Sequence, residues 1–266
     1  MGYLNTNYGQ IFYKEYGTGE AIVFLNGIAM STNSWSPFIN QISKNYKMIV
    51  IDLIDQGVSK GFEGFYTLEV QADVLKVVLD ILNIRKAHLV GMSYGGKVAL
   101  TFALKYMNNV SSLSLVNTDA YTSKFNQELG RAWVLAASSL NGELFSSVLL
   151  PSMYSVNYYE NNMDKMKQKE KYFAEILNQN WFERFNRTII SSKSYNVMDN
   201  VHKIEVPTLI VTSDEDITIP KKLQYQVHKK IKNSKMVIIK ESGHAIMYEK
   251  PKEFIEEIMN FINKIK

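Results

Sequence analysis

Short apolar runs alternate with segments of helical periodicity up to about residue 120, and again after residue 206. Ala21–Leu25 is apolar throughout, as expected of a strand that is covered on both faces of a sheet. Similar runs predict strands at residues 47–53, 87–90, 112–116, 206–211 and 236–239. Strands that alternate with helices indicate parallel pairing through right-handed crossovers. The pattern therefore predicts an α/β fold with a mostly parallel central sheet flanked by helices.

The segments between these runs carry helix and turn signals. Residues 3–16 predict two short strands that turn around Asn7-Tyr8-Gly9. Ser34 is expected to cap a helix whose apolar positions, beginning with Trp35, recur at helical spacing. Further helices are predicted from Thr67 to about residue 82, at residues 221–230 and after residue 251.

The strand and helix alternation is interrupted between residues 121 and 200. This stretch shows helical periodicities rich in aromatic residues and methionine, without a convincing buried strand. An all-helical block inside an α/β pattern indicates an insertion. We therefore expect a core made of residues 1–120 and 201–266, with a helical cap at 121–200.

Composition narrows the class of protein. The 266 residues are 46% hydrophobic and 21% charged, which is typical of a globular domain. The net charge of +4 is spread along the chain, so nucleic acid is not an expected partner. Without cysteine the chain has no disulfide, catalytic thiolate or cysteine-bound metal. No apolar run is long enough to span a membrane, and the N-terminal residues do not resemble a secretory signal, so we expect a soluble cytoplasmic protein. The oligomeric state is not indicated.

Ser93 is the strongest chemical signal in the chain. It stands in Gly91-Met92-Ser93-Tyr94-Gly95, directly after an apolar run and before a helical segment. The G-x-S-x-G spacing is typical of a sharp strand-to-helix turn that presents a nucleophilic serine. Side chains two residues before and after the serine would collide in so tight a turn, which favours glycine there. The helix N-terminus also favours a developing negative charge.

A serine nucleophile needs a base, and four histidines are available. His88, His202 and His228 are expected to be packing or surface residues. His244 differs because it follows Glu241-Ser242-Gly243 in the loop after the last predicted strand. Loops at the carboxyl ends of parallel strands are where α/β folds place ligands, so we predict His244 as the general base.

The orienting carboxylate is expected in the loop after residues 206–211. Asp214 and Asp216 both lie there, and Asp216 is favoured because its distance from Pro220 allows it to face the imidazole. Asp119, after the preceding strand, is a third candidate. The order serine, aspartate, histidine along the chain is a known arrangement of such triads.

Taken together, these segments resemble the α/β-hydrolase fold superfamily, and within it the small capped serine esterases and related hydrolases. The resemblance covers essentially the whole chain and rests on four ordered motifs: Asp52…Gly57-Val58-Ser59, Gly91–Gly96, Ser213–Asp216…Pro220 and Gly243-His244. It implies an oxyanion hole formed by the backbone N–H groups of Tyr94 and Ile28.

Two loops depart from the family pattern. Asn26 replaces the usual histidine before Gly27, and we expect the oxyanion hole to survive because asparagine can hydrogen-bond locally. In the segment that often reads D-x-R-G-x-G-x-S, Ile54 and Asp55 replace arginine and glycine. That loop is expected to be structural.

The expected reaction is hydrolysis of a carboxylic ester of an apolar acyl or aromatic small molecule, through an acyl-enzyme on Ser93. Thioesters and the carbon–carbon bonds of β-diketones are alternatives for the same machinery. A small-molecule receptor or a non-catalytic interaction protein is the alternative of another class. Neither a metal nor a cofactor is expected, because no motif for either is present. The residues expected to line the substrate pocket are Met30, Trp133, Phe145, Met153 and Trp181.

Overall fold

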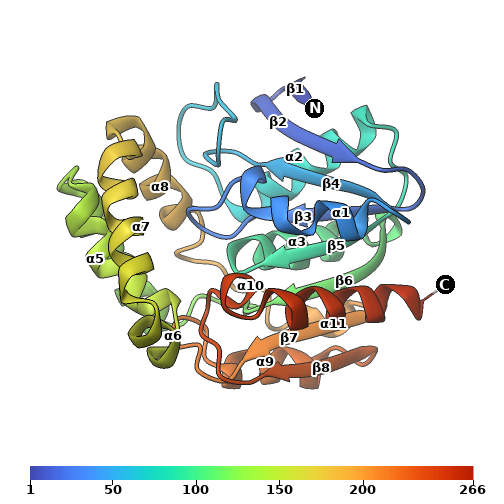
Figure 1. Ribbon diagram of the computed structural model, residues 1–266. Helices are drawn as coiled ribbons and strands as arrows, with labels where there is room; N and C mark the ends of the chain where they lie inside the picture. Colours follow the sequence, from blue (N-terminus) through green and yellow to red (C-terminus); the bar gives the residue numbers. More distant parts are fainter. Residues whose placement is uncertain (266) are drawn as a thin grey trace.

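A computed structural model describes residues 1–265 and contains an eight-stranded sheet (Figure 1). The strand order is β1-β2-β4-β3-β5-β6-β7-β8. β1 and β2 form the expected hairpin and pair antiparallel, as does β2 with β4, whereas all pairs from β4 to β8 are parallel. The mostly parallel sheet predicted from the sequence is confirmed. Its strands are Gly2–Thr6 (β1), Gly9–Tyr16 (β2), Ala21–Leu25 (β3), Lys47–Asp52 (β4), Ala87–Met92 (β5), Val110–Val116 (β6), Thr208–Ser213 (β7) and Ser234–Ile239 (β8).

Helices cover both faces of the sheet, and consecutive residues of a strand face opposite layers. In β3, Val23 packs with one buried cluster and Phe24 with the other. The first cluster includes helices α2 (Leu68–Ile81), α3 (Tyr94–Lys105) and α9 (Lys221–Lys230). The second includes the 3-10 helix η1 (Thr32–Phe38), α1 (Ile39–Ile42), α10 (Ile246–Glu249) and α11 (Pro251–Asn263). Burial on both faces explains why the strands read as continuous apolar runs.

The helix expected to begin at Ser34 is different in the structure. A 3-10 helix begins at Thr32 and contains Pro37, and only the last four residues, Ile39–Ile42, are α-helical. The Ser34 hydroxyl lies inside this element and accepts a hydrogen bond from the Ser31 N–H at 3.3 Å. Proline lacks the N–H that continues an α-helix, which accounts for the tighter and shorter geometry. Two further 3-10 turns are Met107–Asn109 (η2) and Val201–Lys203 (η3).

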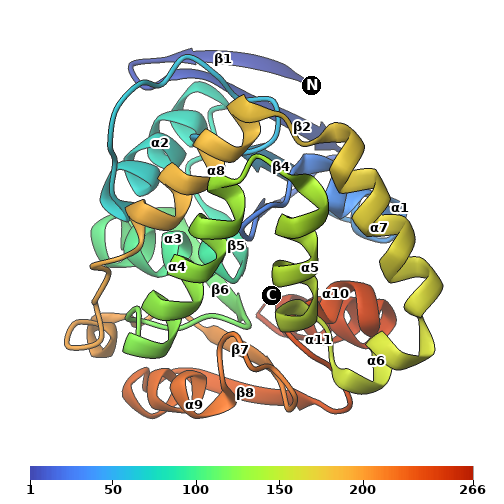
Figure 2. The ribbon, with the colours of Figure 1, turned by 90° about the vertical axis from the view of Figure 1, so that its left-hand side faces the viewer.

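Five helices between β6 and β7 form an insertion, here called the cap, over the carboxyl ends of the strands (Figure 2). Their chain enters and leaves side by side: Tyr121 pairs with Asn196, and Val197 N–H donates to the Ala120 carbonyl at 2.8 Å. The two ends of the insertion are therefore held together. The cap helices are Lys124–Ser138 (α4), Gly142–Met153 (α5), Val156–Asn161 (α6), Met163–Ile176 (α7) and Gln179–Ser191 (α8).

Ion pairs fix one side of the cap to the loop after β4. Arg187 of α8 makes two hydrogen bonds to Asp55, at 2.7 and 2.8 Å, and Arg184 donates to the carbonyls of Gln56 and Gly57. Asp55 has a positive φ of 62°, the region that glycine adopts most easily. Asp55, which replaces the glycine of the family pattern, therefore adopts the backbone conformation that this loop requires and also binds the cap through Arg187. No helix among residues 1–265 is both long and apolar enough to cross a membrane.

Candidate active site

Ser93 lies at the sharp turn between β5 and α3. Its backbone has φ 52° and ψ −114°, a strained combination for a residue with a side chain. A Cβ on Gly91 would lie 2.5 Å from the Gly95 carbonyl oxygen, so glycine is needed across the turn. A Cβ on Gly95 would instead lie 2.2 Å from the Leu25 carbonyl oxygen. The second glycine therefore makes room for β3 rather than for the turn itself.

His244 links Ser93 to a buried carboxylate. Its Nε2 lies 2.8 Å from Ser93 Oγ, and its Nδ1 lies 2.8 Å from Asp216 Oδ2. The other oxygen of Asp216 accepts the Ile219 N–H at 2.8 Å, which fixes the carboxylate plane. Only 4% of His244 and 5% of Asp216 is exposed, so the imidazole and the carboxylate are buried, whereas Ser93 is partly exposed to the cavity.

Asp216 is the carboxylate that reaches His244, and the two other candidates lie elsewhere. Asp214 is in the same loop, where its N–H donates to the Ile239 carbonyl at 3.3 Å. Asp119 is fully buried and forms an ion pair with Lys97 Nζ at 3.1 Å. Burial raises the pKa of Asp119, and the Lys97 charge opposes this effect. Asp119 therefore neutralises a lysine that lies one helical turn after Ser93.

The other histidines lie outside the relay. His88, in β5, and His228, in α9, bond through Nδ1 to the hydroxyls of Ser112 and Ser234, each at 2.8 Å. His202 lies in η3. Among residues 1–265, no three His, Asp or Glu side chains come together in a way that could hold a metal ion.

Asn117, for which the sequence carries no motif, holds the loop that bears His244. Its amide Nδ2 donates to the His244 carbonyl at 3.0 Å and to Ser213 Oγ at 2.9 Å. Its Oδ1 accepts the Ser213 N–H at 2.9 Å. The amide thus ties the ends of β6 and β7 to the backbone of His244, and nothing in the sequence separates it from an ordinary polar residue after a strand.

Glu249 also binds the loop that carries His244 and joins this loop to the cap. Its carboxylate accepts the Gly243 N–H at 3.0 Å and the Ser155 hydroxyl at 2.6 Å. The Ala245 N–H donates to the Met153 carbonyl at 2.7 Å, so the loop meets α5 directly. Burial raises the pKa of Glu249, and its hydrogen bonds from Ser155 and Gly243 oppose this rise.

The loop after β3 lies against Ser93. A Cβ on Gly27 would approach the Ser93 Cβ at 3.5 Å, and Ile28 lines the cavity described below. Asn26 is fully buried: its Nδ2 donates to Asp52 Oδ1 at 3.0 Å and its Oδ1 accepts from Trp35 Nε1 at 2.7 Å. Asparagine in place of histidine therefore anchors the base of the loop to β4 and to η1.

Tyr94 and Ile28 were predicted as backbone donors, and both residues border Ser93 or its cavity. Tyr94 is the first residue of α3, where N–H groups have no acceptor within the helix. The predicted role belongs to the Tyr94 backbone and not to its side chain, whose hydroxyl lies 2.8 Å from Ser191 Oγ in α8. Burial raises the pKa of this hydroxyl.

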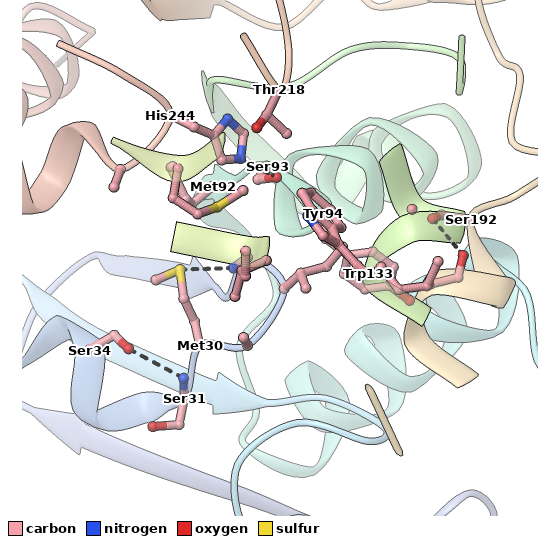
Figure 3. A pocket seen from close by; sticks show the side chains of 18 of the residues that line it. Met30, Ser31, Ser34, Met92, Ser93, Tyr94, Trp133, Ser192, Thr218 and His244 are labelled. Carbon is pink, nitrogen blue, oxygen red and sulfur yellow. Dashed lines mark hydrogen bonds between the residues drawn. The ribbon is translucent and has the colours of Figure 1, made fainter. Parts of the chain in front are cut away.

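A cavity of about 960 Å³ lies between the sheet edge and the cap, and Ser93 and His244 are part of its wall (Figure 3). Four of the five residues predicted for the pocket line it: Met30, Trp133, Met153 and Trp181. Met30 Sδ also accepts the Gly27 N–H at 3.2 Å, drawn as a dashed line in Figure 3.

Phe145 does not line the cavity, and its predicted pocket role is wrong. It is fully buried inside the cap, with ring centroids 4.9 Å from Phe185, 5.4 Å from Trp181 and 5.5 Å from Phe182. Phe145 packs the cap helices together, whereas Trp181 belongs to both the cap core and the cavity wall. An aromatic residue on a cap helix can face either side, and the sequence does not distinguish them.

Comparison with known proteins agrees with this architecture. The family model of the alpha/beta hydrolase fold matches residues 20–148. MGS-M2, an alpha/beta hydrolase enzyme from a Medee basin deep-sea metagenome library, is 32% identical, with coverage of 98% of this chain and 97% of its own and a TM-score of 0.96. The enol-lactonase from Burkholderia xenovorans is 19% identical, with coverage of 98% and 99% and a TM-score of 0.87, a likeness of fold alone.

The chain is also similar in sequence to a lipase. Monoacylglycerol lipase ABHD6 of Homo sapiens is 24% identical over 94% of this chain and 77% of its own length. The MGS-M2 similarity exceeds 30% identity over nearly the whole chain, and the sheet order and the serine turn agree with the matched family. The chain therefore belongs to the α/β-hydrolase fold superfamily and is a hydrolase of that fold.

Proposed function

We propose that this hydrolase cleaves carboxylic esters of apolar acyl or aromatic small molecules through an acyl-enzyme on Ser93. One observation carries the proposal: Ser93 Oγ, the His244 ring and the Asp216 carboxylate are joined by two 2.8 Å contacts beside a cavity of about 960 Å³. A serine hydroxyl becomes a nucleophile when a neighbouring base takes its proton and a third group orients that base.

In the proposed reaction, His244 Nε2 accepts the Ser93 proton while Oγ attacks the ester carbonyl carbon. Asp216 accepts a hydrogen bond from Nδ1–H, which fixes the imidazole tautomer and stabilises the imidazolium. The tetrahedral intermediate collapses, and His244 donates the proton to the departing alcohol oxygen. Water then attacks the acyl-enzyme with His244 again as base, which releases the acid and restores Ser93.

The backbone N–H groups of Ile28 and Tyr94 are the proposed donors to the oxyanion. Tyr94 opens α3, so the partial positive charge of the helix N-terminus adds to its N–H. The contact of Gly27 with Ser93 supports a place for Ile28 beside the reacting carbonyl. One donor of this kind is worth about 2.7–4 kcal/mol of transition-state stabilisation in a comparable hydrolase.

The cavity wall supports an apolar acyl or aromatic group. Met30, Met153, Trp133 and Trp181 present thioether and aromatic surface to the cavity. Pockets of this kind hold small molecules mainly by apolar contact, with a few polar groups that fix orientation. The names of two relatives, an enol-lactonase and a monoacylglycerol lipase, are consistent with an ester bond as the point of cleavage.

Initial rates on p-nitrophenyl esters of increasing acyl length test this proposal, with a thioester and a β-diketone measured beside them. We expect repeated turnover of esters by the wild type, and a loss of about 10⁶-fold in rate in Ser93→Ala, as for the nucleophile of a comparable triad. Folding of the variant is checked by circular dichroism. Absence of turnover across the panel by folded wild-type protein would contradict the proposal and favour a receptor or interaction role.

A further inference from the structure

Four of the described lysines line the cavity. Lys97 is paired with Asp119 and Lys193 is exposed, which leaves Lys14 and Lys169. Lys14 lies on β2 and Lys169 on α7, and both border the same cavity as Ser93. Each is partly buried rather than fully exposed. A lysine usually keeps its ammonium group in water, so two that share the wall of a largely apolar cavity call for an explanation.

Neutral groups, not carboxylates, contact these two ammonium groups. Lys14 Nζ donates to Asn33 Oδ1 at 2.6 Å, and Lys169 Nζ lies 5.2 Å from the centre of the Tyr248 ring. Within residues 1–265, neither Nζ has a carboxylate oxygen within 4.0 Å. The Lys14–Asn33 hydrogen bond is exposed to solvent, and the contact of Lys169 with the Tyr248 ring is a weak one, so both positive charges remain available to an anion.

The acids nearest to these lysines are already engaged. Asp52 acts on Lys14 electrostatically, but its oxygens accept hydrogen bonds from Asn26, Thr32 and Val58. On the cap, Glu170 pairs with Lys167 at 2.7 Å. Asp52 and Glu128 are the two acids of the described residues that line the cavity wall. Glu128 belongs to α4 and pairs with Arg131 at 2.7 Å.

The two lysines lie at one continuous rim. Lys14 contacts Asn33 of η1, Lys169 contacts Tyr248 of α10, and Tyr248 interacts with Ser34 of η1. Other residues of the wall, Met30, Met153 and Met247, are apolar. The cavity therefore combines a nucleophile, an apolar wall and a cationic rim formed by Lys14 and Lys169.

We propose that this cationic rim binds an anionic group of the substrate, so that the preferred ester carries a negative charge remote from the scissile bond. This inference rests on the proposed ester hydrolysis and specifies its substrate class. A carboxylate or a phosphate at the far end of an apolar chain or ring has the required chemistry. Burial lowers the pKa of Lys169, and a bound anion would favour its charged form.

The test compares esters that differ only in terminal charge. The probes are p-nitrophenyl monoesters of straight-chain dicarboxylic acids with six, eight and ten carbons, each paired with the ester whose far end is a primary amide. A third set carries a terminal phosphate. We expect the wild type to prefer at least one anionic ester over its neutral match by about tenfold in kcat/KM, the scale of one hydrogen bond to a charged group. The preference should fall at high salt.

Variants of the rim separate recognition from folding. Lys169→Met should lose the preference mainly through a higher KM for the anionic ester, so that the ratio of kcat/KM between the anionic ester and its neutral match falls toward one. Lys14→Met should act in the same direction, and Lys169→Arg should retain the preference because it keeps the charge. Lys171→Met is the matched control, because Lys171 is an exposed residue of the same helix and lies outside the cavity wall.

The outcomes separate this inference from the proposed function. Equal turnover of anionic and neutral esters by the wild type would overturn the cationic rim and leave ester hydrolysis in place. A preference that persists in Lys169→Met and Lys14→Met would also overturn it. Failure of the wild type to hydrolyse any ester would overturn the proposed function and this inference with it. The relative rates of the carboxylate and phosphate sets identify the anion.

Discussion

Asn117 offers a sharp test of how the fold positions His244. The side chain is fully buried and bonds to the Ser213 N–H, the Ser213 hydroxyl and the His244 carbonyl, at 2.9, 2.9 and 3.0 Å. Its backbone has a φ of 43°, a conformation that asparagine tolerates better than most residues. One amide therefore supports the end of β7, the loop that carries His244 and a strained turn together.

Asn117→Ala leaves at least two buried groups without partners, the Ser213 N–H and the His244 carbonyl. Each orphaned group costs about 1–3 kcal/mol, and the left-handed backbone adds roughly 1–2 kcal/mol of strain for alanine. The free energy of unfolding should therefore fall by about 3 kcal/mol or more, a large share of the roughly 5–15 kcal/mol of an ordinary domain. The value of kcat should fall as well, because His244 loses a backbone contact.

Two further substitutions separate strain from hydrogen bonding. Asn117→Gly removes the strain but not the loss of hydrogen bonds, so it should be more stable than Asn117→Ala and still impaired in kcat. Asn117→Asp keeps the oxygen that accepts the Ser213 N–H but turns a second oxygen toward the His244 carbonyl. It should be destabilised, and more so when the buried carboxyl is ionised.

Urea unfolding and initial rates on a short p-nitrophenyl ester provide the measurements. Asn161→Ala, in which an exposed amide of α6 is removed, is the control and should change stability by less than about 0.5 kcal/mol. An Asn117→Ala protein with wild-type stability and kcat would show that the amide has no part in positioning His244.

Three further substitutions test the turn, the cap and the Glu249 carboxylate. Gly91→Ala should destabilise the protein by more than about 2 kcal/mol in urea unfolding, because its Cβ would meet backbone at 2.5 Å, whereas Gly2→Ala, with nothing within 4 Å, should not. Arg187→Met should speed hydrogen exchange in α8 by breaking the ion pair with Asp55; unchanged exchange would contradict a role in holding the cap. Burial raises the pKa of Glu249 above 4.5, so folding favours its protonated form and wild-type stability should fall as pH rises just above 4.5. Glu249→Gln should flatten this slope in unfolding measured against pH, and an unchanged slope would contradict the assignment.

Most of the sheet could be predicted because burial on both faces leaves a direct mark on the sequence. Ala21–Leu25 is apolar throughout and forms β3 with the same bounds. The segment after Ser31 was harder, since Trp35 and Phe38 have helical spacing although Pro37 imposes a 3-10 geometry. Spacing records which side chains are buried, not how tightly the backbone winds.

The candidate site was predictable where a motif and a position in the fold coincide. Ser93 has its glycine spacing, and Asp216 and His244 follow the parallel strands β7 and β8, whose carboxyl ends lie at the same side of the sheet. Phe145 shows the limit, because its direction depends on how the cap helices dock. Lys169 shows the same limit, because its position around the axis of α7 determines whether it faces the cavity or solvent, and the sequence does not show which side of α7 faces the cavity.

Covalent trapping at Ser93 is the most direct test of the central claim. The protein is treated with a fluorophosphonate, and with a p-nitrophenyl ester under rapid quench, and the site and stoichiometry are read by intact-protein and peptide mass spectrometry. We predict one phosphonyl or acyl group per chain, attached to Ser93, with no adduct in Ser93→Ala and a greatly slowed reaction in His244→Ala. Ester turnover without an adduct on Ser93, or an adduct on another residue that forms at the rate of turnover, would contradict it.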